Sequence, residues 1–378
     1  MTLDRRRLLA LGAGAALMGG AARAAGDPAQ ADLDALLANT GVPGLTGAVV
    51  TATGLDALVA GGVRRQGAPG TVTTADVWHL GSNTKAMTGA LYGRLVDQGQ
   101  ARWGLTVPEL FPDLTVDAAW KAITIDQLFG HRAGIDDRTV FASGWLMRAH
   151  SDARPLRDQR MDLAKAVFAV PPSAPPGPML YSNVGYILAG AAIERIADAS
   201  WEAAITDRLF KPLGITGAGF GPPKGAQPWG HRASRPATPD APVVLTPVEP
   251  TSLGSDNPAA LGPAGCVHMS MTDYARFIRL FLTKGGEVLK PETVERLVTP
   301  VPGEGRGYAI GWGLVPERPW ARGAVLAHEG SNTLWHAVAI VAPARGIGII
   351  TAANAPPGAN KGASTTLARQ LQERFAAV

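Results

Sequence analysis

The spacing of apolar residues differs between the two ends of the chain and its middle. Near the start, leucines between residues 33 and 37 have helical spacing and are followed by Gly41, which predicts a short helix. Runs of β-branched and small apolar residues at 45–51 and 57–61 then predict two strands joined by a turn. The chain after its first residues is therefore expected to begin with a helix and a hairpin.

The end of the chain has the same kinds of element. Apolar runs at 324–328, 336–341 and 347–352 predict three consecutive strands, and periodic apolar residues at 367–375 predict a terminal amphipathic helix. Because each end supplies strands and a helix, we expect both ends to form one antiparallel sheet that is covered by helices.

The middle of the chain has mainly helical spacing. Six segments carry it: 82–99, 124–129, 163–170, 184–197, 201–209 and 272–282. The longest connection, 219–265, is rich in proline, and a loop of that length is usually functional. We therefore expect an α/β (α+β) fold, with a sheet part from about 25–80 and 305–378 and an inserted, mainly helical part from about 81–304.

The first residues are typical of an export signal. Three consecutive arginines at 5–7 precede a short run of Ala, Gly and Leu, and small residues at 22–24 suit a cleavage site. We interpret 1–24 as a twin-arginine signal that is cut after Ala24, leaving 25–378 as a periplasmic domain. The apolar run is too short and too rich in glycine for a stable membrane anchor.

Removal of this signal changes the charge argument. Residues 1–24 carry a net +3 of the formal +4 of the whole chain, so the remainder is almost neutral and gives no indication of nucleic-acid binding. The single cysteine, Cys266, excludes an intrachain disulfide, and we expect it to be a buried, small apolar residue.

The chemistry is predicted to centre on Ser82 and Lys85. A serine and a lysine three positions apart at the start of a helix lie on one face, one turn apart. The N–H groups at a helix N-terminus favour negative charge on or near Ser82, and Lys85 can hold the serine proton or stabilise the charge. The alternative is a helix-capping Ser82 beside a solvated Lys85.

Two further triplets supply possible partners. Tyr181 and Asn183 lie where a proline-rich loop enters a helix; a nearby cation would let Tyr181 act as a base, and Asn183 can orient a lysine or a substrate amide. His328 and Gly330 lie at the end of a predicted strand. Gly330 permits close approach of a substrate backbone, and the N–H of Ser331 is a candidate oxyanion donor.

The order S-x-x-K, Y-x-N, H-x-G resembles that of the serine β-lactamase and penicillin-binding-protein superfamily. With a tyrosine in the second motif, the chain resembles the class C β-lactamase branch, whose relatives include D,D-peptidases and esterases. Supporting stretches lie at 131–134, 176–177, 212–215 and 262–265. The resemblance implies a β-lactamase/transpeptidase-like fold with the active site between the α/β part and the helical part.

The resemblance also implies a role for each residue. Ser82 would be the acyl-forming nucleophile, Lys85 its proton-holding neighbour, and Tyr181 a proton relay helped by Asn183. The backbone N–H groups of Ser82 and Ser331 would form the oxyanion hole. Whether Lys85 or Tyr181 is the acylation base stays open, because the two would titrate as a coupled pair.

The third motif departs from the family pattern, which has a cationic K-[ST]-G where this chain has His328, Glu329 and Gly330. An ordinary histidine is mostly neutral at pH 7, and strand alternation can direct Glu329 away from the cleft. The strand therefore offers a weaker positive charge for binding a substrate carboxylate, and we do not expect strong β-lactamase activity.

The resulting hypothesis is an exported serine hydrolase that acts on an ester or on a small peptide or amide. The alternatives are a D,D-carboxypeptidase, a class C-type β-lactamase and a non-catalytic penicillin- or muropeptide-binding protein. No G-x-S-x-G, H-E-x-x-H or phosphate-binding motif is present in the sequence, so neither a metal nor a cofactor is implied. The substrate and the oligomeric state stay open.

Overall fold

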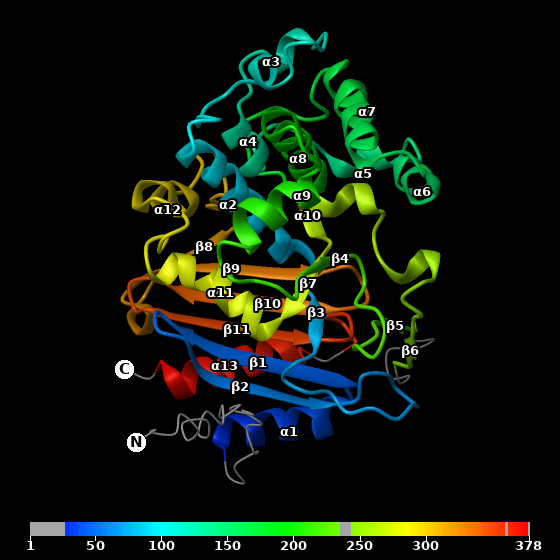
Figure 1. Cartoon of the computed structure of the whole chain (residues 1–378), viewed down its shortest axis with the longest axis vertical. Helices are drawn as coiled ribbons and strands as arrows, with labels where there is room; N and C mark the ends of the chain where they lie inside the picture. Colours follow the sequence, from blue (N-terminus) through cyan, green and yellow to red (C-terminus); the bar gives the residue numbers. More distant parts are fainter. Residues whose placement is uncertain (1–26, 235–242, 360–361, 377–378) are drawn as a thin grey trace, which may run out of the picture.

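A six-stranded antiparallel sheet, built from both ends of the chain, forms the lower half of the molecule as viewed in Figure 1. The computed structural model describes residues 27–234, 243–359 and 362–376, so the proposed signal at 1–24 lies outside the described residues. The strand order is β2-β1-β11-β10-β9-β8. Their bounds are β1 Gly44–Thr51, β2 Leu55–Gly62, β8 Gly313–Arg318, β9 Gly323–Ser331, β10 His336–Ala342 and β11 Ile347–Ala353. The expected antiparallel sheet from both ends of the chain is confirmed.

Both faces of this sheet are covered by helices. Helices α1 (Pro28–Thr40) and α13 (Ala363–Phe375) bury one face through a cluster that includes Leu33, Val49 and Leu367. Helix α11 (Met271–Leu282) packs on the other face against β1 and β11. The strands consequently contain long apolar runs, as expected for a sheet that is buried on both sides.

The remaining helices gather above the sheet and form the helical lobe (Figure 1). Their bounds are α2 Thr84–Asp97, α3 Val107–Leu110, α4 Ile125–Phe129, α5 Asp137–Phe141, α6 Trp145–Ser151, α7 Leu156–Phe168, α8 Asn183–Ala197, α9 Trp201–Ile205, α10 Gly262–Gly265 and α12 Pro291–Val298. Of these, α8 is buried along most of its length. No described helix combines the length and the apolar character needed to cross a membrane.

The proline-rich segment 219–265 contains short strands as well as loops. These are β4 (Gly219–Phe220), β5 (His231–Ala233) and β6 (Leu245–Pro247). Strand β4 pairs with β7 (Val267–Ser270), which in turn pairs with β3 (Val77–His79). These strands are too short to carry a periodic pattern of apolar residues, and their partners are far away in the sequence. The sequence pattern therefore does not reveal their pairing. The small sheet matters for the site because β3 ends at His79, three residues before Ser82.

Candidate active site

Ser82 lies in a single 3₁₀ turn, Gly81–Asn83, that joins β3 to α2. Lys85 follows in the first turn of α2, and its side chain is fully buried. The Lys85 Nζ donates a hydrogen bond of 3.0 Å to the Ser82 Oγ. The serine and the lysine therefore face each other one turn apart, whereas a solvated Lys85 was the alternative.

All three donors of the Lys85 ammonium group have an acceptor. Besides Ser82, Nζ donates to the Asn183 Oδ1 at 2.8 Å and to the Ala264 carbonyl oxygen at 2.7 Å. These neutral acceptors come from α8 and α10. They hold the buried cation in one position beside the Ser82 hydroxyl, since an unpaired buried ammonium group would be costly.

Tyr181 lies at the open edge of this cluster. Its ring centroid is 4.9 Å from the Lys85 Nζ, and the residue is 39% exposed. The ring also contacts the imidazole of His131, with centroids 4.3 Å apart. The Nδ1 of His131 accepts from the Ser182 N–H at 3.1 Å, so His131 fixes both the ring and the backbone of this segment.

The first turn of α8 is anchored by a carboxylate that the sequence patterns did not reveal. The Asp137 side chain, from α5, accepts from the Ser182 Oγ at 2.6 Å and from the backbone N–H groups of Asn183 and Val184. These N–H groups have no partner within the helix. Asp137 thereby orients the residue that contacts Lys85.

His328 is a neutral, fully hydrogen-bonded imidazole. Its Nδ1 lies 2.9 Å from the Glu329 carbonyl, which can only accept, so Nδ1 carries the proton and Nε2 accepts from the Tyr308 hydroxyl at 2.9 Å. Burial, and then the nearby Lys85 charge, lower the pKa of His328 to about 3. Neither nitrogen is left to bind a substrate carboxylate.

Glu329 lies on the opposite face of β9 from His328. Its carboxylate is exposed and is 3.3 Å from the His336 Nε2, on the neighbouring strand β10. As expected from strand alternation, its negative charge points away from Lys85.

The backbones of Gly81 and Gly330 touch, which brings the two candidate oxyanion donors together. A Cβ placed on Gly330 would lie 2.8 Å from the Ser82 nitrogen, and one on Gly81 would collide with the Ser331 nitrogen. Only glycine permits this approach, and Gly81 also has a positive φ of 52°. The amides of Ser82 and Ser331 thus flank the same backbone contact.

The sequence patterns also did not reveal Asp256, whose carboxylate binds both of the segments that meet at the Gly81–Gly330 contact. It accepts from the His79 Nε2 at 2.8 Å and from the Asn332 Nδ2 at 2.7 Å. His79 Nδ1 in turn accepts from the Gly81 N–H. Asp256 therefore connects the residues just before Ser82 with the residue just after Ser331.

The structure thus brings all of the candidate site residues together at one place: Ser82, Lys85, Tyr181, Asn183, His328, Gly330 and Ser331. His131 and Ala264 lie in the glycine-containing stretches 131–134 and 262–265, which carried part of the resemblance. Asp137, Asp256 and Tyr308 have no comparable signal. Among the described residues, no three His, Cys, Asp or Glu side chains are grouped so that they could hold a metal ion.

This arrangement suits attack by a serine hydroxyl on a carbonyl carbon. A buried ammonium group touches the hydroxyl, a tyrosine lies against that ammonium group, and two backbone amides lie nearby.

Comparisons with known proteins agree with the fold and identify the family. The family model described as Beta-lactamase matches residues 29–373. Penicillin-binding protein 4 of Amycolatopsis lactamdurans is 28% identical over 364 residues, which span 92% of this chain and 90% of that protein. The unguisins hydrolase ungD' of Aspergillus campestris is 26% identical, over 92% of this chain and 66% of that protein.

Among solved structures, the D-amino acid amidase from Ochrobactrum anthropi SV3, complexed with L-phenylalanine amide, superposes with a TM-score of 0.71. It is 18% identical, and the match covers 92% of this chain and 98% of that one. At this identity the likeness establishes the fold.

Proposed function

The chain belongs to the beta-lactamase family of serine hydrolases, and on that premise we propose that it is an exported enzyme that forms an acyl-enzyme on Ser82. Its substrates are proposed to be esters or small peptides and amides that carry no carboxylate beside the bond that is cut.

The contact between Ser82 and Lys85 carries this proposal. The 3.0 Å hydrogen bond joins a half-buried hydroxyl to an ammonium group that Asn183 and Ala264 hold in place. A helix-capping serine with a solvated lysine needs no such arrangement. Activation of a serine by a fixed neighbour is the usual requirement for this nucleophile.

In the proposed reaction, the Ser82 Oγ attacks the substrate carbonyl carbon, and its proton passes to the member of the Lys85–Tyr181 pair that is deprotonated. While Lys85 is an ammonium group, that acceptor is the Tyr181 oxygen as a phenolate. The oxyanion that forms would accept hydrogen bonds from the N–H groups of Ser82 and Ser331. Collapse of the tetrahedral intermediate breaks the bond to the alcohol or amine, which leaves with a proton from the same pair. Water then attacks the acyl-enzyme carbonyl carbon and gives a proton to the same pair. The acyl–Oγ bond breaks, the pair returns the proton to the Ser82 Oγ, and a carboxylic acid is released.

The preference for neutral substrates rests on His328. Both of its nitrogens are engaged, and burial together with Lys85 keeps its pKa far below 7, so it adds no positive charge. The relatives named a hydrolase of unguisins and a lovastatin esterase are consistent with this choice. The relative named penicillin-binding protein 4 favours the alternative of a penicillin-binding protein.

Intact-mass spectrometry tests the proposal directly. The full-length chain is expressed in a bacterium that has the twin-arginine pathway, and the purified protein is incubated with a fluorophosphonate, a p-nitrophenyl ester or a penicillin. We expect one fluorophosphonate adduct and turnover of the ester. Ser82→Ala should lose the adduct and about 10⁴-fold or more of the hydrolysis rate. The same masses show whether the chain now begins at Ala25, as export with cleavage requires.

Ser331→Ala is the matched control, because it removes a nearby hydroxyl but keeps the backbone N–H. It should retain both the adduct and most of the rate. A long-lived penicillin adduct would favour the D,D-carboxypeptidase, and rapid penicillin turnover would favour a β-lactamase. No adduct with any probe would reject the catalytic proposal and favour a non-catalytic binding protein.

A further inference from the structure

The helical lobe contains a cavity of about 580 Å³ between α5, α6 and α7. The cavity is not lined by any of the candidate catalytic residues Ser82, Lys85, Tyr181 and Asn183. Its volume lies within the range of pockets that hold small organic molecules, roughly 300–1,000 Å³. Nothing in the proposed hydrolysis uses this space.

The cavity has mostly apolar walls. Trp120 and Trp145 line it together with aliphatic side chains such as Ile135, Leu163 and Val167. These side chains suit an apolar ligand body, either an alkyl chain or an aromatic ring. Val170, which also lines the cavity, is 55% exposed, so an apolar surface continues to the outside.

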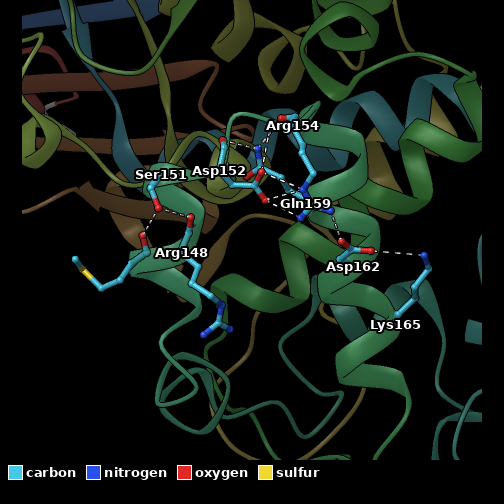
Figure 2. Close-up of polar contacts among 8 residues, drawn as sticks. Arg148, Ser151, Asp152, Arg154, Gln159, Asp162 and Lys165 are labelled. Carbon is cyan, nitrogen blue, oxygen red and sulfur yellow. Dashed lines mark hydrogen bonds and ion pairs between the residues drawn. The ribbon is translucent and has the colours of Figure 1, made fainter.

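Most charges around the cavity neutralise one another. Figure 2 shows Arg154 between Asp152 and Asp162, with 2.7 Å contacts to each, and Lys165 at 3.5 Å from Asp162. Gln159 donates to the Asp152 and Arg154 carbonyl oxygens. This group has no free charge to offer a ligand.

Arg148 is the exception. Its guanidinium group points away from the Asp152–Arg154 pair in Figure 2 and donates to the Ser143 carbonyl oxygen at 2.5 Å and to the Ser143 Oγ at 3.5 Å. No carboxylate among the described residues forms an ion pair with it. An exposed cation therefore lies at the edge of an apolar cavity, without an anion to balance it.

We propose that this cavity binds a small organic carboxylate with an apolar body. The body would lie against Trp120 and Trp145, and the carboxylate would accept two parallel hydrogen bonds from the guanidinium of Arg148. A ligand cation is disfavoured because both nearby carboxylates, Asp152 and Asp162, are already paired with Arg154.

The site is one short helix away from the proposed active site. Helix α5 contributes Thr139 and Val140 to the cavity, while Asp137 at its start holds Asn183. The binding proposal itself does not depend on catalysis, so it is tested in a chain without the proposed nucleophile.

The experiment is isothermal titration calorimetry of the Ser82→Ala protein with sodium decanoate and with 2-naphthoate. We expect one molecule bound per chain for at least one of these carboxylates. Arg148→Gln should weaken carboxylate binding about five- to tenfold, as expected for loss of a partly exposed charged contact. Binding of 1-decanol, which has no charge, should be the same with and without Arg148.

Two more variants locate the site. Ala166, an exposed residue of α7 that lines the cavity, is replaced by tryptophan to fill it, and Ala166→Trp should abolish binding while its thermal unfolding stays cooperative. Arg208→Gln is the matched control, since Arg208 also donates to neutral side-chain oxygens but does not line the cavity. Unchanged binding in Ala166→Trp, equal weakening by Arg208→Gln, or no binding of either carboxylate would overturn the proposal.

Discussion

The imidazole of His328 lies between the Tyr308 hydroxyl and the Glu329 carbonyl oxygen, beneath the protein surface and near the Lys85 charge. Two features of this environment disfavour a second proton on the ring and outweigh the hydrogen bond to Glu329: burial removes water, and Lys85 repels a like charge. A histidine that is accessible to substrate would behave differently. The surroundings, more than the residue type, therefore set the charge at this strand position.

This neutral state has a consequence for stability that pH titration can measure. The unfolded chain protonates His328 below a pH of about 6.5, whereas the folded chain does so only near 3. Between these values the unfolded state binds one more proton, so the contribution of His328 to the free energy of unfolding falls as the pH falls. In urea unfolding between pH 4 and 6.5, His328→Gln should reduce the pH slope by up to about 1.4 kcal/mol per pH unit.

Some of the slope should remain in that variant. Burial is also the main cause that lowers the pKa of His131, His231 and His268, so these side chains contribute in the same direction. Equal slopes for the two proteins would contradict a neutral, buried His328.

At the scale of elements, the side chain of one residue in α5 accepts hydrogen bonds from the first turn of α8. Helix α5 is only one turn long, and its Asp137 supplies the acceptors for the unpaired N–H groups at the N-terminus of α8. The carboxylate also lies at the positive end of the α8 dipole. A short helix from one segment thereby fixes the position of Asn183 in another.

Asp137→Asn should accordingly destabilise the protein and slow catalysis. One acceptor and the negative charge are lost, which should cost about 1–2 kcal/mol in urea unfolding. Because Asn183 holds Lys85, kcat for the p-nitrophenyl ester should fall about tenfold or more, with a smaller change in KM. Asp137 is a positioning residue, since its carboxylate binds the start of α8 and contacts neither Ser82 nor Lys85.

The neighbouring carboxylate provides the control. Asp136 caps α5 itself, and its carboxylate accepts hydrogen bonds from Arg138. Its backbone contacts lie within α5 and at the Ser173 hydroxyl, and among the described residues none of its hydrogen bonds reaches α8. Asp136→Asn should leave kcat within about twofold. An equal loss in both variants would show that the effect comes from melting of α5 and not from the contact with α8.

The sequence pattern predicted elements best where their hydrophobic runs are long. The five strands expected at 45–51, 57–61, 324–328, 336–341 and 347–352 all exist. Four of them are inner strands, which are continuously apolar because both faces are buried, and β2 at one edge still carries a short apolar run. Strand β8, Gly313–Arg318, was missed: it lies at the sheet edge, contains proline and charged residues, and has an irregular register. The short helices α5 and α6 have too few turns for a readable period.

Site residues follow a similar rule. Ser82, Lys85, Tyr181 and Asn183 belong to local triplets whose spacing is visible in the chain. Asp137 and Asp256 are single acidic residues far in sequence from the groups they bind, and Ala264 contributes only a backbone carbonyl oxygen. Nothing local distinguishes such residues, because their role depends on the three-dimensional packing.

At the scale of the whole molecule, a buried ion network in the helical lobe supports one side of the candidate active site. Arg160 of α7 is fully buried and lies 2.5 Å from both the Glu194 and Glu202 carboxylates. It also donates to the Ala260 carbonyl oxygen at 2.9 Å, in the turn that leads into α10. Helix α10 then presents the Ala264 carbonyl oxygen to Lys85.

Removal of Arg160 should therefore affect both stability and catalysis. Arg160→Met leaves Glu194, whose pKa burial already raises, without its main partner. Breaking a buried ion pair from one side typically costs about 3–5 kcal/mol, and urea unfolding should show a loss of that size. A lower kcat for the p-nitrophenyl ester is expected as well, because the turn before α10 loses its anchor.

Two comparisons separate the network from ordinary surface charge. Arg157, one turn earlier in α7, pairs with the highly exposed Asp198, and Arg157→Met should cost less than about 1 kcal/mol. Adding Glu194→Met to Arg160→Met should recover part of the lost stability, because the more deeply buried of the two carboxylates is no longer left without a partner and only Glu202 remains. If kcat stays low in that double variant although stability returns, the Arg160 contact with the Ala260 carbonyl is what positions α10. If kcat returns together with stability, the network acts only through folding of the helical lobe.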